Sequence, residues 1–176
     1  MKKYLAIPIL SLVLSPIFAQ NWTTITNRTP HFRFALPNNP NIVDTLRVKY
    51  YYYKLDTVIG FQVHLMDSAY YDTKNDIFNE ALKQTKGDTL RAITKIMIAF
   101  SHAELTSIQN INTSPLFKGL EIGLKYKDLV SNRVAFSFIR FYRSRGKFIS
   151  FTITGYGDDL QRLIRNKNQF FTSITF

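Results

Sequence analysis

The sequence predicts an α+β domain in which a central antiparallel sheet is flanked by helices on both faces. Several stretches alternate apolar and polar residues with a period of two, which is typical of strands. One stretch in the middle of the chain changes to spacings of three and four residues, which is typical of an amphipathic helix. In residues 134–142 apolar side chains fall on both faces of one strand, and such a strand needs cover on both sides.

Three strands are predicted in the first part of the chain. Every second residue of segment 31–37, HFRFALP, is a large apolar residue. Segment 45–57 is rich in β-branched and aromatic residues and is predicted as the second strand, and segment 58–67 follows as the third. Segment 38–41, NNPN, is predicted to be a turn. Segment 21–30 has little periodicity and is predicted to be a lead-in without regular structure.

An amphipathic helix is predicted from Thr73 to Met97. Gly87 and Asp88 interrupt its pattern and are predicted either to kink it or to divide it into two helices. The residues of its apolar face are Ile77, Phe78, Ala81, Leu82, Thr85, Leu90, Ile93, Ile96 and Met97.

Strand character returns after this helix. Segments 103–111 and 114–128 are each predicted as a strand. Segments 134–142 and 148–154 are predicted to form a hairpin, with Gly146 in a turn position that requires a positive φ.

A second helix is predicted near the C-terminal end of the sequence. Asp158 is expected to cap its first turn, because Gln161 follows at the spacing of a capping box. The last four residues, SITF, are predicted to be extended. The apolar side of this helix is made of Leu160, Leu163, Ile164, Phe170 and Phe171.

The first residues have the pattern of a secretory signal peptide. Lys2 and Lys3 precede an apolar run, and cleavage is expected between Ala19 and Gln20. A transmembrane anchor is the alternative, but the run is shorter than the ~20 residues that span a bilayer and it contains two prolines. We therefore expect a signal peptide over residues 1–19 and a single domain over residues 20–176, located in the periplasm or outside the cell.

Composition narrows the possible partners. The net charge of +11 favours anionic partners, although export argues against intracellular nucleic acid. The absence of cysteine excludes disulfides, a thiolate zinc site, a cysteine nucleophile and anchoring through a lipidated cysteine.

Two groups of residues are candidates for binding. Arg140, Arg143, Arg145 and Lys147 are predicted to cluster at the tip of the hairpin, where they either contact an anionic partner or simply solvate the turn. The second group is a run of four tyrosines, which must alternate between the two faces of a strand. It either packs the sheet or forms an aromatic platform for a sugar. These four are Tyr50, Tyr51, Tyr52 and Tyr53.

No motif for catalysis, metal binding or cofactor binding is recognisable. The three histidines, His31, His64 and His102, lack the spacing of a metal site, and a nucleophile elbow and a phosphate-binding glycine loop are both missing. We therefore expect no enzyme activity and no cofactor. A secreted hydrolase would require a deep pocket that joins His64 or His102 to a carboxylate.

Three segments resemble the PsbP-like family of exported α/β/α sandwich domains. These are HFRFALP near the start, SPLFKGLEIGLKY after the long helix, and NQFFTSITF at the end. The resemblance implies a central antiparallel sheet with helices on both sides and no conserved catalytic apparatus. It also implies a non-enzymatic auxiliary that docks onto a larger, often membrane-bound, assembly. No functional residue is carried over, because these motifs are structural.

Three functional hypotheses follow from the sequence. The first is an exported auxiliary domain that docks onto a protein partner in the cell envelope through a basic surface. The second is a binding module for an acidic glycan or a lipid headgroup, which an exposed tyrosine row beside basic residues would favour. The third, a secreted hydrolase, is the least favoured. No specific nucleic-acid partner is expected, and the chain is not expected to span a membrane after signal cleavage.

Overall fold

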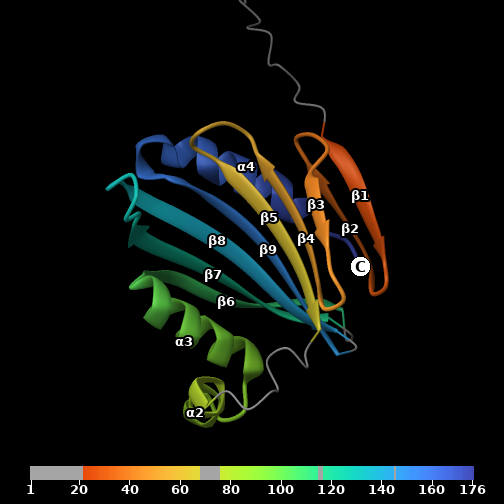
Figure 1. Cartoon of the computed structure of the whole chain (residues 1–176), viewed down its shortest axis with the longest axis vertical. Coiled ribbons are helices and arrows are strands. Elements are labelled where there is room, and N and C mark those ends of the chain that lie inside the picture. Colours follow the sequence, from red (N-terminus) through yellow and green to blue (C-terminus); the bar gives the residue numbers. More distant parts are fainter. Residues whose placement is uncertain (1–21, 68–75, 115–116, 145) are drawn as a thin grey trace, which may run out of the picture.

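The computed structural model describes residues 22–67, 76–114, 117–144 and 146–176, with the backbone alone for residues 112–114. Within these residues, seven strands form one antiparallel sheet in the order β3-β4-β5-β9-β8-β7-β6, and two form a separate hairpin (Figure 1). The predicted α+β class and the antiparallel sheet are confirmed. The elements are β1 (Thr23–Arg28), β2 (His31–Leu36), β3 (Asn41–Asp44), β4 (Val48–Lys54), β5 (Gly60–Asp67), α2 (Asp76–Gln84), α3 (Thr89–Ser101), β6 (Glu104–Ser114), β7 (Phe117–Lys127), β8 (Val134–Ser144), β9 (Lys147–Tyr156), the 3-10 turn η1 (Gly157–Asp159) and α4 (Leu160–Thr172).

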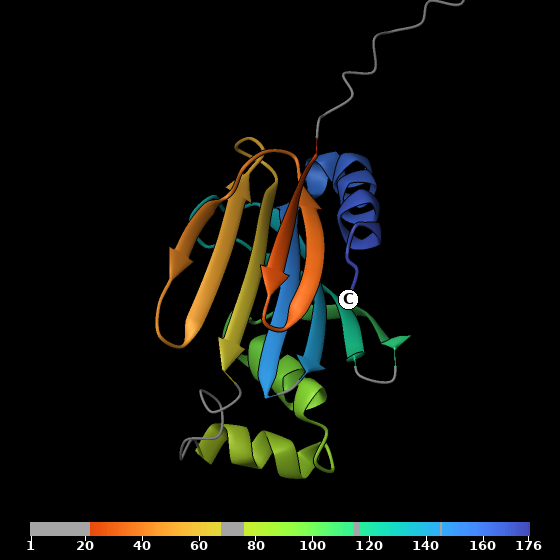
Figure 2. The same ribbon diagram turned by 90° about the vertical axis from the view of Figure 1, so that its right-hand side faces the viewer.

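One face of the sheet is covered by α4 and by the β1–β2 hairpin, which lie side by side in Figures 1 and 2. Phe61 of β5 and Phe151 of β9 point to this face and are fully buried. Phe151 packs edge-on against Phe32 and Phe34 of β2, with ring centroids 5.7 Å away in both cases, and lies 6.2 Å from the ring of Phe170 in α4. This aromatic cluster joins the hairpin, the sheet and the C-terminal helix into one core.

The opposite face is concave and only partly covered. Helix α3 packs on β7 and β8, and α2 packs on α3 (Figure 1). Ala92 and Ile93 of α3 are buried against Ile122 and Ile139 of the sheet. On this side the helices do not cover β4 and β5. The polar residues of these two strands therefore face a groove.

Two strands were not predicted. Segment 21–30 contains β1, which pairs with β2 along its whole length, so its prediction as a lead-in was wrong. Its inward positions carry Ile25 and Asn27, and a buried asparagine hides the apolar period that marks a strand. Strand β3 begins at Asn41, inside the predicted turn, and all four of its residues are exposed. An edge strand without a buried face leaves no hydrophobic pattern in the sequence.

The predicted long helix is divided into two. Gly87 has a φ of 83° and ends α2, and the Asp88 carboxylate then accepts a hydrogen bond of 3.0 Å from the backbone N–H of Arg91, which caps α3. Residues 73–75 of the predicted helix lie outside the described residues. The predicted turn glycine of the β8–β9 hairpin, Gly146, has the expected positive φ of 73°.

The start of α4 differs from the prediction. Asp158 lies in η1 and forms an ion pair with Arg133 instead of capping the helix. Asp159 occupies the N-cap position without a side-chain hydrogen bond to the helix, and contacts Arg162. Ile164, predicted on the apolar side, is 40% exposed. Because residues 157–159 form a 3-10 turn, the helix begins at Leu160, one residue later than a cap at Asp158 implies.

The end of the sequence closes onto the N-terminal hairpin, as its predicted extended form allows. Arg33 and Thr175 exchange two backbone hydrogen bonds of 2.8 and 3.0 Å. The Ala35 N–H donates to Ser173 Oγ, 138 residues away along the chain. The ring of Phe176 stacks on Phe117 with centroids 3.9 Å apart.

The predicted signal peptide, residues 1–19, lies outside the described residues and stays a prediction, as does the domain boundary at residue 20. In the part of the chain that the structure describes, none of the helices is long and apolar enough to cross a membrane.

Replacing Phe151 tests the aromatic core. Phe151→Ala removes a fully buried ring that contacts β2 and α4. We expect it to lower the free energy of unfolding by about 3–5 kcal/mol, measured by urea denaturation. Leu129→Ala, at a residue that is 94% exposed, is the control and should change stability by less than about 0.5 kcal/mol. Equal effects of the two variants would contradict the role given to Phe151.

Candidate functional site

A groove runs between the concave face of the sheet and helix α3. It consists of two adjoining hollows of about 450 and about 620 Å³. Gln62, Tyr126 and Thr154 line both hollows, which makes the two continuous. Each hollow has the volume of an ordinary small-molecule site, which is about 300–1,000 Å³.

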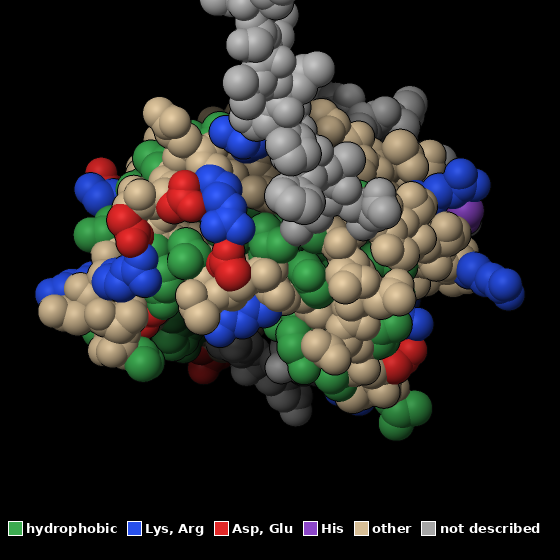
Figure 3. Space-filling view, turned by 90° about the horizontal axis from the view of Figure 1, so that it is seen from above, with side chains coloured by type: hydrophobic (Ala, Val, Ile, Leu, Met, Phe, Trp, Pro, Cys, Tyr) green, Lys and Arg blue, Asp and Glu red, His purple; other side chains and the backbone are tan. Residues whose placement is uncertain are grey.

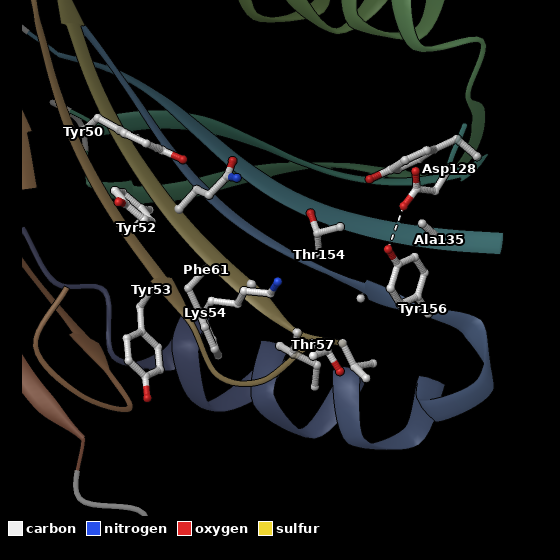
Figure 4. A pocket seen from close by; sticks show the side chains of 16 residues that line it. Tyr50, Tyr52, Tyr53, Lys54, Thr57, Phe61, Asp128, Ala135, Thr154 and Tyr156 are labelled. Carbon is white, nitrogen blue, oxygen red and sulfur yellow. Dashed lines mark hydrogen bonds between the residues drawn. The ribbon is translucent and has the colours of Figure 1, made fainter. Parts of the chain in front are cut away.

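Two of the four tyrosines form an aromatic pair on the floor of this groove. Tyr50 and Tyr52 point to the α3 side of β4, where they pair with His64 and Gln62 of β5 (Figure 4). Their rings stack with centroids 5.3 Å apart and an interplanar angle of 19°. The ring of His64 meets the ring of Tyr50 edge-on at 4.5 Å. Tyr52 is 38% exposed, so this pair offers a rigid aromatic surface to a ligand.

The other two tyrosines belong to the opposite face. Tyr51 is buried, and its ring packs edge-on against Phe34 at 5.3 Å. Tyr53 lies toward Phe61 on the α4 side (Figure 4). The predicted alternation is therefore observed, and the candidate platform is reduced to Tyr50 and Tyr52.

Gly60 lies on the floor of the groove, where the absence of a side chain makes the groove deeper. It pairs with Lys54 on one side and Thr154 on the other, and a Cβ atom built on it would have no heavy atom within 4 Å. A glycine inside a strand often marks a place where a ligand approaches the backbone. The missing side chain leaves open space beside the tyrosine pair.

The walls of the groove differ in chemistry. Helix α3 contributes Ile96, Met97 and Phe100, and Phe100 is 71% exposed. At one end of the groove the Tyr156 hydroxyl donates to Asp128 Oδ2 at 2.6 Å (Figure 4). This hydrogen bond, with those from the Val130 N–H and the Ser131 side chain, lowers the pKa of Asp128 to about 2. Asp128 is therefore an ionised, satisfied carboxylate and not a poised acid.

The surroundings of His64 favour its neutral form, and no carboxylate among the described residues lines its own hollow. Burial lowers its pKa, because the charged imidazolium would be poorly solvated there. Its Nε2 atom is buried without a hydrogen-bond partner among the described residues. The hollow that His64 lines has no carboxylate in its lining, so the acid–base pair that a hydrolase would need is not assembled at His64.

The other two histidines lie apart. His102 ends α3 in the left-handed conformation, and His31 is exposed on β2. Within the described ranges, no three side chains of the types that ligate metals are grouped closely enough to hold an ion.

The predicted basic cluster at the hairpin tip is divided by the structure. Arg140 lies within β8, not at the tip, because β8 extends to Ser144. It donates to Glu121 Oε2 at 2.6 Å and to the carbonyl oxygen of Phe171 at 2.9 Å. Lys167 contacts the other oxygen of Glu121 at 3.2 Å. Arg140 therefore ties β7, β8 and α4 together.

This buried cluster of charges keeps Glu121 ionised. Burial alone raises the pKa of Glu121, but the hydrogen bond and charge of Arg140, together with Lys167, outweigh it and hold the pKa below its ordinary value. Sequence could not assign this role, because Glu121 and Arg140 meet only through the strand pairing of β7 and β8.

Lys147 and Arg143 do lie near the hairpin tip. Lys147 forms an ion pair of 3.0 Å with Asp67. Arg143 lies on the α3 face over the ring of Phe148, 5.7 Å from its centroid. Arg145 lies outside the described residues. Contact of these residues with an anionic partner stays a prediction.

Other basic residues, not predicted from sequence, join Lys147 at this end of the sheet. Arg28, Arg47 and Lys49 line a hollow of about 470 Å³ together with Lys147. We call these four residues the basic end. Arg28 is the last residue of β1, Arg47 lies in the β3–β4 turn, Lys49 lies near the start of β4, and Lys147 begins β9. No local pattern connects them, so only the fold reveals the group.

The arrangement of strands and helices was compared with known structures. The cyanobacterial PsbP protein CyanoP from Synechocystis sp. PCC 6803 matches with a TM-score of 0.56 and 14% sequence identity, over 91% of this chain and 95% of that chain. This chain has the PsbP-like fold. The fold that the three sequence segments predicted is therefore confirmed.

Two further structures match with lower TM-scores. Protein PA94 from Pseudomonas aeruginosa matches with a TM-score of 0.46 and 10% identity, over 84% of this chain and 92% of that chain. LpqN, involved in cell envelope biogenesis of Mycobacterium tuberculosis, matches with a TM-score of 0.44 and 12% identity, over 88% of this chain and 90% of that chain. No family model and no curated protein matches the sequence.

Arg140→Met tests whether Arg140 is structural. The change leaves a buried carboxylate with a single cation, so we expect the free energy of unfolding to fall by about 3 kcal/mol at neutral pH. The pKa of Glu121 is lowered in the folded protein, so its contribution is present above the ordinary carboxylate pKa of about 4 and is lost as the pH falls through the folded value.

The difference between wild type and Arg140→Met should therefore shrink in acid, when both are followed by urea denaturation. Arg143→Met is the matched control, because Arg143 is exposed and has no carboxylate partner among the described residues. A loss in the control as large as in Arg140→Met would contradict this assignment.

Proposed function

We propose that this protein is an exported, non-enzymatic binding domain and that its groove holds a glycan segment. The observation that carries the proposal is the stacked pair of Tyr50 and Tyr52 beside the open space at Gly60. The outer face of the Tyr52 ring, held in place by the stacked ring of Tyr50, suits the apolar face of a sugar ring. Tyrosine provides such a surface at a low cost in side-chain entropy. The space above Gly60 leaves room for the ring.

The polar lining of the groove supports a hydroxyl-rich ligand. Gln62, Thr152 and Thr154 place neutral donors and acceptors along the floor, and each can exchange hydrogen bonds with sugar hydroxyls. Lys54 lies at the rim beside the tyrosine pair. Its ammonium group favours a glycan that carries a carboxylate.

The same lining favours binding over catalysis. Hydrolysis of a glycosidic bond ordinarily requires two carboxylates about 5–10 Å apart on either side of the bond. Asp128 is the one carboxylate in the lining of the two hollows, and it is held by Tyr156. The groove therefore offers recognition without an acid–base pair.

A second candidate function is docking onto a component of the cell envelope through a basic surface. Most carboxylates of the described chain already form ion pairs, for example Asp44 with Lys49 and Asp56 with Arg162. Arg28 and Arg47 at the basic end have no carboxylate partner among the described residues. The excess positive charge is thus available to an anionic partner, as the net charge of the sequence suggests.

Gly60→Val tests the groove. Valine at this position fills the space beside Tyr52 without backbone strain, and it also suits a strand better than glycine does. We expect wild type to bind members of a panel of neutral and uronic-acid oligosaccharides, measured by titration calorimetry. The variant should bind at least ~10-fold more weakly, a change of about 1.4 kcal/mol, at an unchanged or higher melting temperature.

Thr24→Val on the exposed side of β1 is the control, because it adds the same side chain far from the groove. Tyr52→Ala should weaken binding without filling the groove. The glycan proposal would be wrong if no oligosaccharide bound to wild type, or if Gly60→Val bound oligosaccharides as tightly as wild type does.

Docking is tested separately by sedimentation of the tagged protein with envelope fractions of its host. We expect co-sedimentation at low salt and release at high salt, because exposed charge pairs are screened. A protein that stays in the supernatant at low salt would contradict docking, whatever the result for the groove.

A further inference from the structure

The basic end is built where three turns meet. The β1–β2 turn, the β3–β4 turn and the start of β9 come together at the lower end of the sheet in Figures 1 and 2. Thr26, Thr29 and Thr45 add hydroxyl groups to the hollow between them. Its lining is therefore polar and mainly cationic, since Asp44, the one carboxylate in the lining, is paired with Lys49.

Two of the four cations are free to bind a ligand. Lys49 lies 2.9 Å from Asp44, and Lys147 lies 3.0 Å from Asp67. Arg28 and Arg47 are exposed, and neither has an ion pair within the part of the chain that the structure describes. Guanidinium groups present paired N–H donors that match the oxygens of a phosphate. The hollow thus fits a phosphate group better than it fits a carbonyl or a hydroxyl ligand.

A leucine projects from the rim of the same hollow. Leu46 is fully exposed, with a relative accessibility of 105%. The turn that carries it is closed by hydrogen bonds between Thr45 and Val48, among them a backbone bond of 3.0 Å from the Thr45 N–H to the Val48 carbonyl. The closed turn holds the side chain outward, next to Arg47. An apolar side chain flanked by cations is the pattern of a peripheral membrane contact, in which the apolar group enters the interface and the cations bind headgroups.

We propose that the basic end and Leu46 dock onto an anionic lipid surface, with Arg28 and Arg47 on headgroup phosphates and Leu46 in the interfacial layer. This inference deepens the docking function and rests on it, whereas it does not depend on the groove. One apolar residue and a few cations give weak, reversible, salt-sensitive binding. Such binding suits a domain that attaches to a surface reversibly.

Among the described residues, the opposite end of the molecule combines exposed apolar side chains with mixed charges. Leu129 is also 94% exposed, but it follows Asp128 and lies in the loop that carries the Arg133–Asp158 ion pair. In the left half of Figure 3, which shows this end, basic and acidic side chains lie next to each other. The arginines there are already paired with carboxylates, as Arg162 is with Asp56 and Asp159, so they attract an anionic surface less. The two ends therefore provide a matched pair of exposed leucines in different electrostatic surroundings.

The experiment is sedimentation of the purified protein with vesicles. One set contains phosphatidylcholine alone, and the other contains phosphatidylcholine mixed with phosphatidylglycerol. We expect binding to the anionic vesicles alone and its loss at high salt. The double change Arg28→Gln and Arg47→Gln should weaken binding roughly 10-fold or more, since each surface cation contributes about a fivefold factor. Leu46→Ser should weaken it several-fold.

Two matched variants serve as controls. Leu129→Ser removes a leucine of similar exposure at the other end, and Lys83→Gln with Lys86→Gln removes the same charge from an exposed helix end. Both should bind like wild type. If the control variants lost as much vesicle binding as the variants of the basic end, net charge or general hydrophobicity would explain the binding, and the proposal would be wrong.

Two other results would also overturn it. Absence of binding to anionic vesicles at low salt is the first. The second is binding of inorganic phosphate that depends on Arg28 and Arg47 while vesicles do not bind, which would make the hollow a site for free phosphate. If vesicle binding fails but co-sedimentation with envelope fractions persists, the docking function stands and its partner is an acidic protein.

Discussion

The alternation of side chains along β4, β5 and β9 is the constraint on which the rest of the structure depends. Every second residue of these strands turns to the hairpin and α4, and this set is almost entirely apolar, as with Phe61, Val63 and Phe151. The intervening residues turn to α3 and are mostly polar or amphipathic, although Phe148 and Met66 are apolar. The hairpin and α4 thus cover one face through the aromatic core, and the other face forms the floor of the groove. A shift of one residue in register would exchange the two sets and destroy both.

Much of the fold could be predicted, because its signals are local. The period of segment 31–37, the break at Gly87 and Asp88 and the positive φ of Gly146 each depend on neighbours in sequence. The missed strands β1 and β3 lack that signal, since one buries an asparagine and the other buries nothing. The alternation of the tyrosines was predictable, but which pair lies in the open groove depends on where α3 and the hairpin pack.

The basic residues show the limit of sequence reasoning more clearly. Charge patterning grouped Arg140 with Lys147 because they are close along the chain. Strand pairing instead places Arg140 on a buried glutamate, and it gathers Arg28, Arg47 and Lys49 around Lys147. A cation's function depends on whether a carboxylate already neutralises it, and that is decided by contacts between distant segments. The sequence therefore shows that the protein carries excess positive charge, but only the structure shows where that charge is available to a partner.

The pairing of Arg33 with Thr175 has a consequence for the order of folding. The N-terminal hairpin cannot complete its contacts until the segment after α4 has reached it, because Ala35 and Ser173 are 138 residues apart. Contacts of such sequence separation form late and slowly. Until then, the aromatic residues beneath the hairpin lie open to solvent, and an unfinished chain presents them to any holding chaperone.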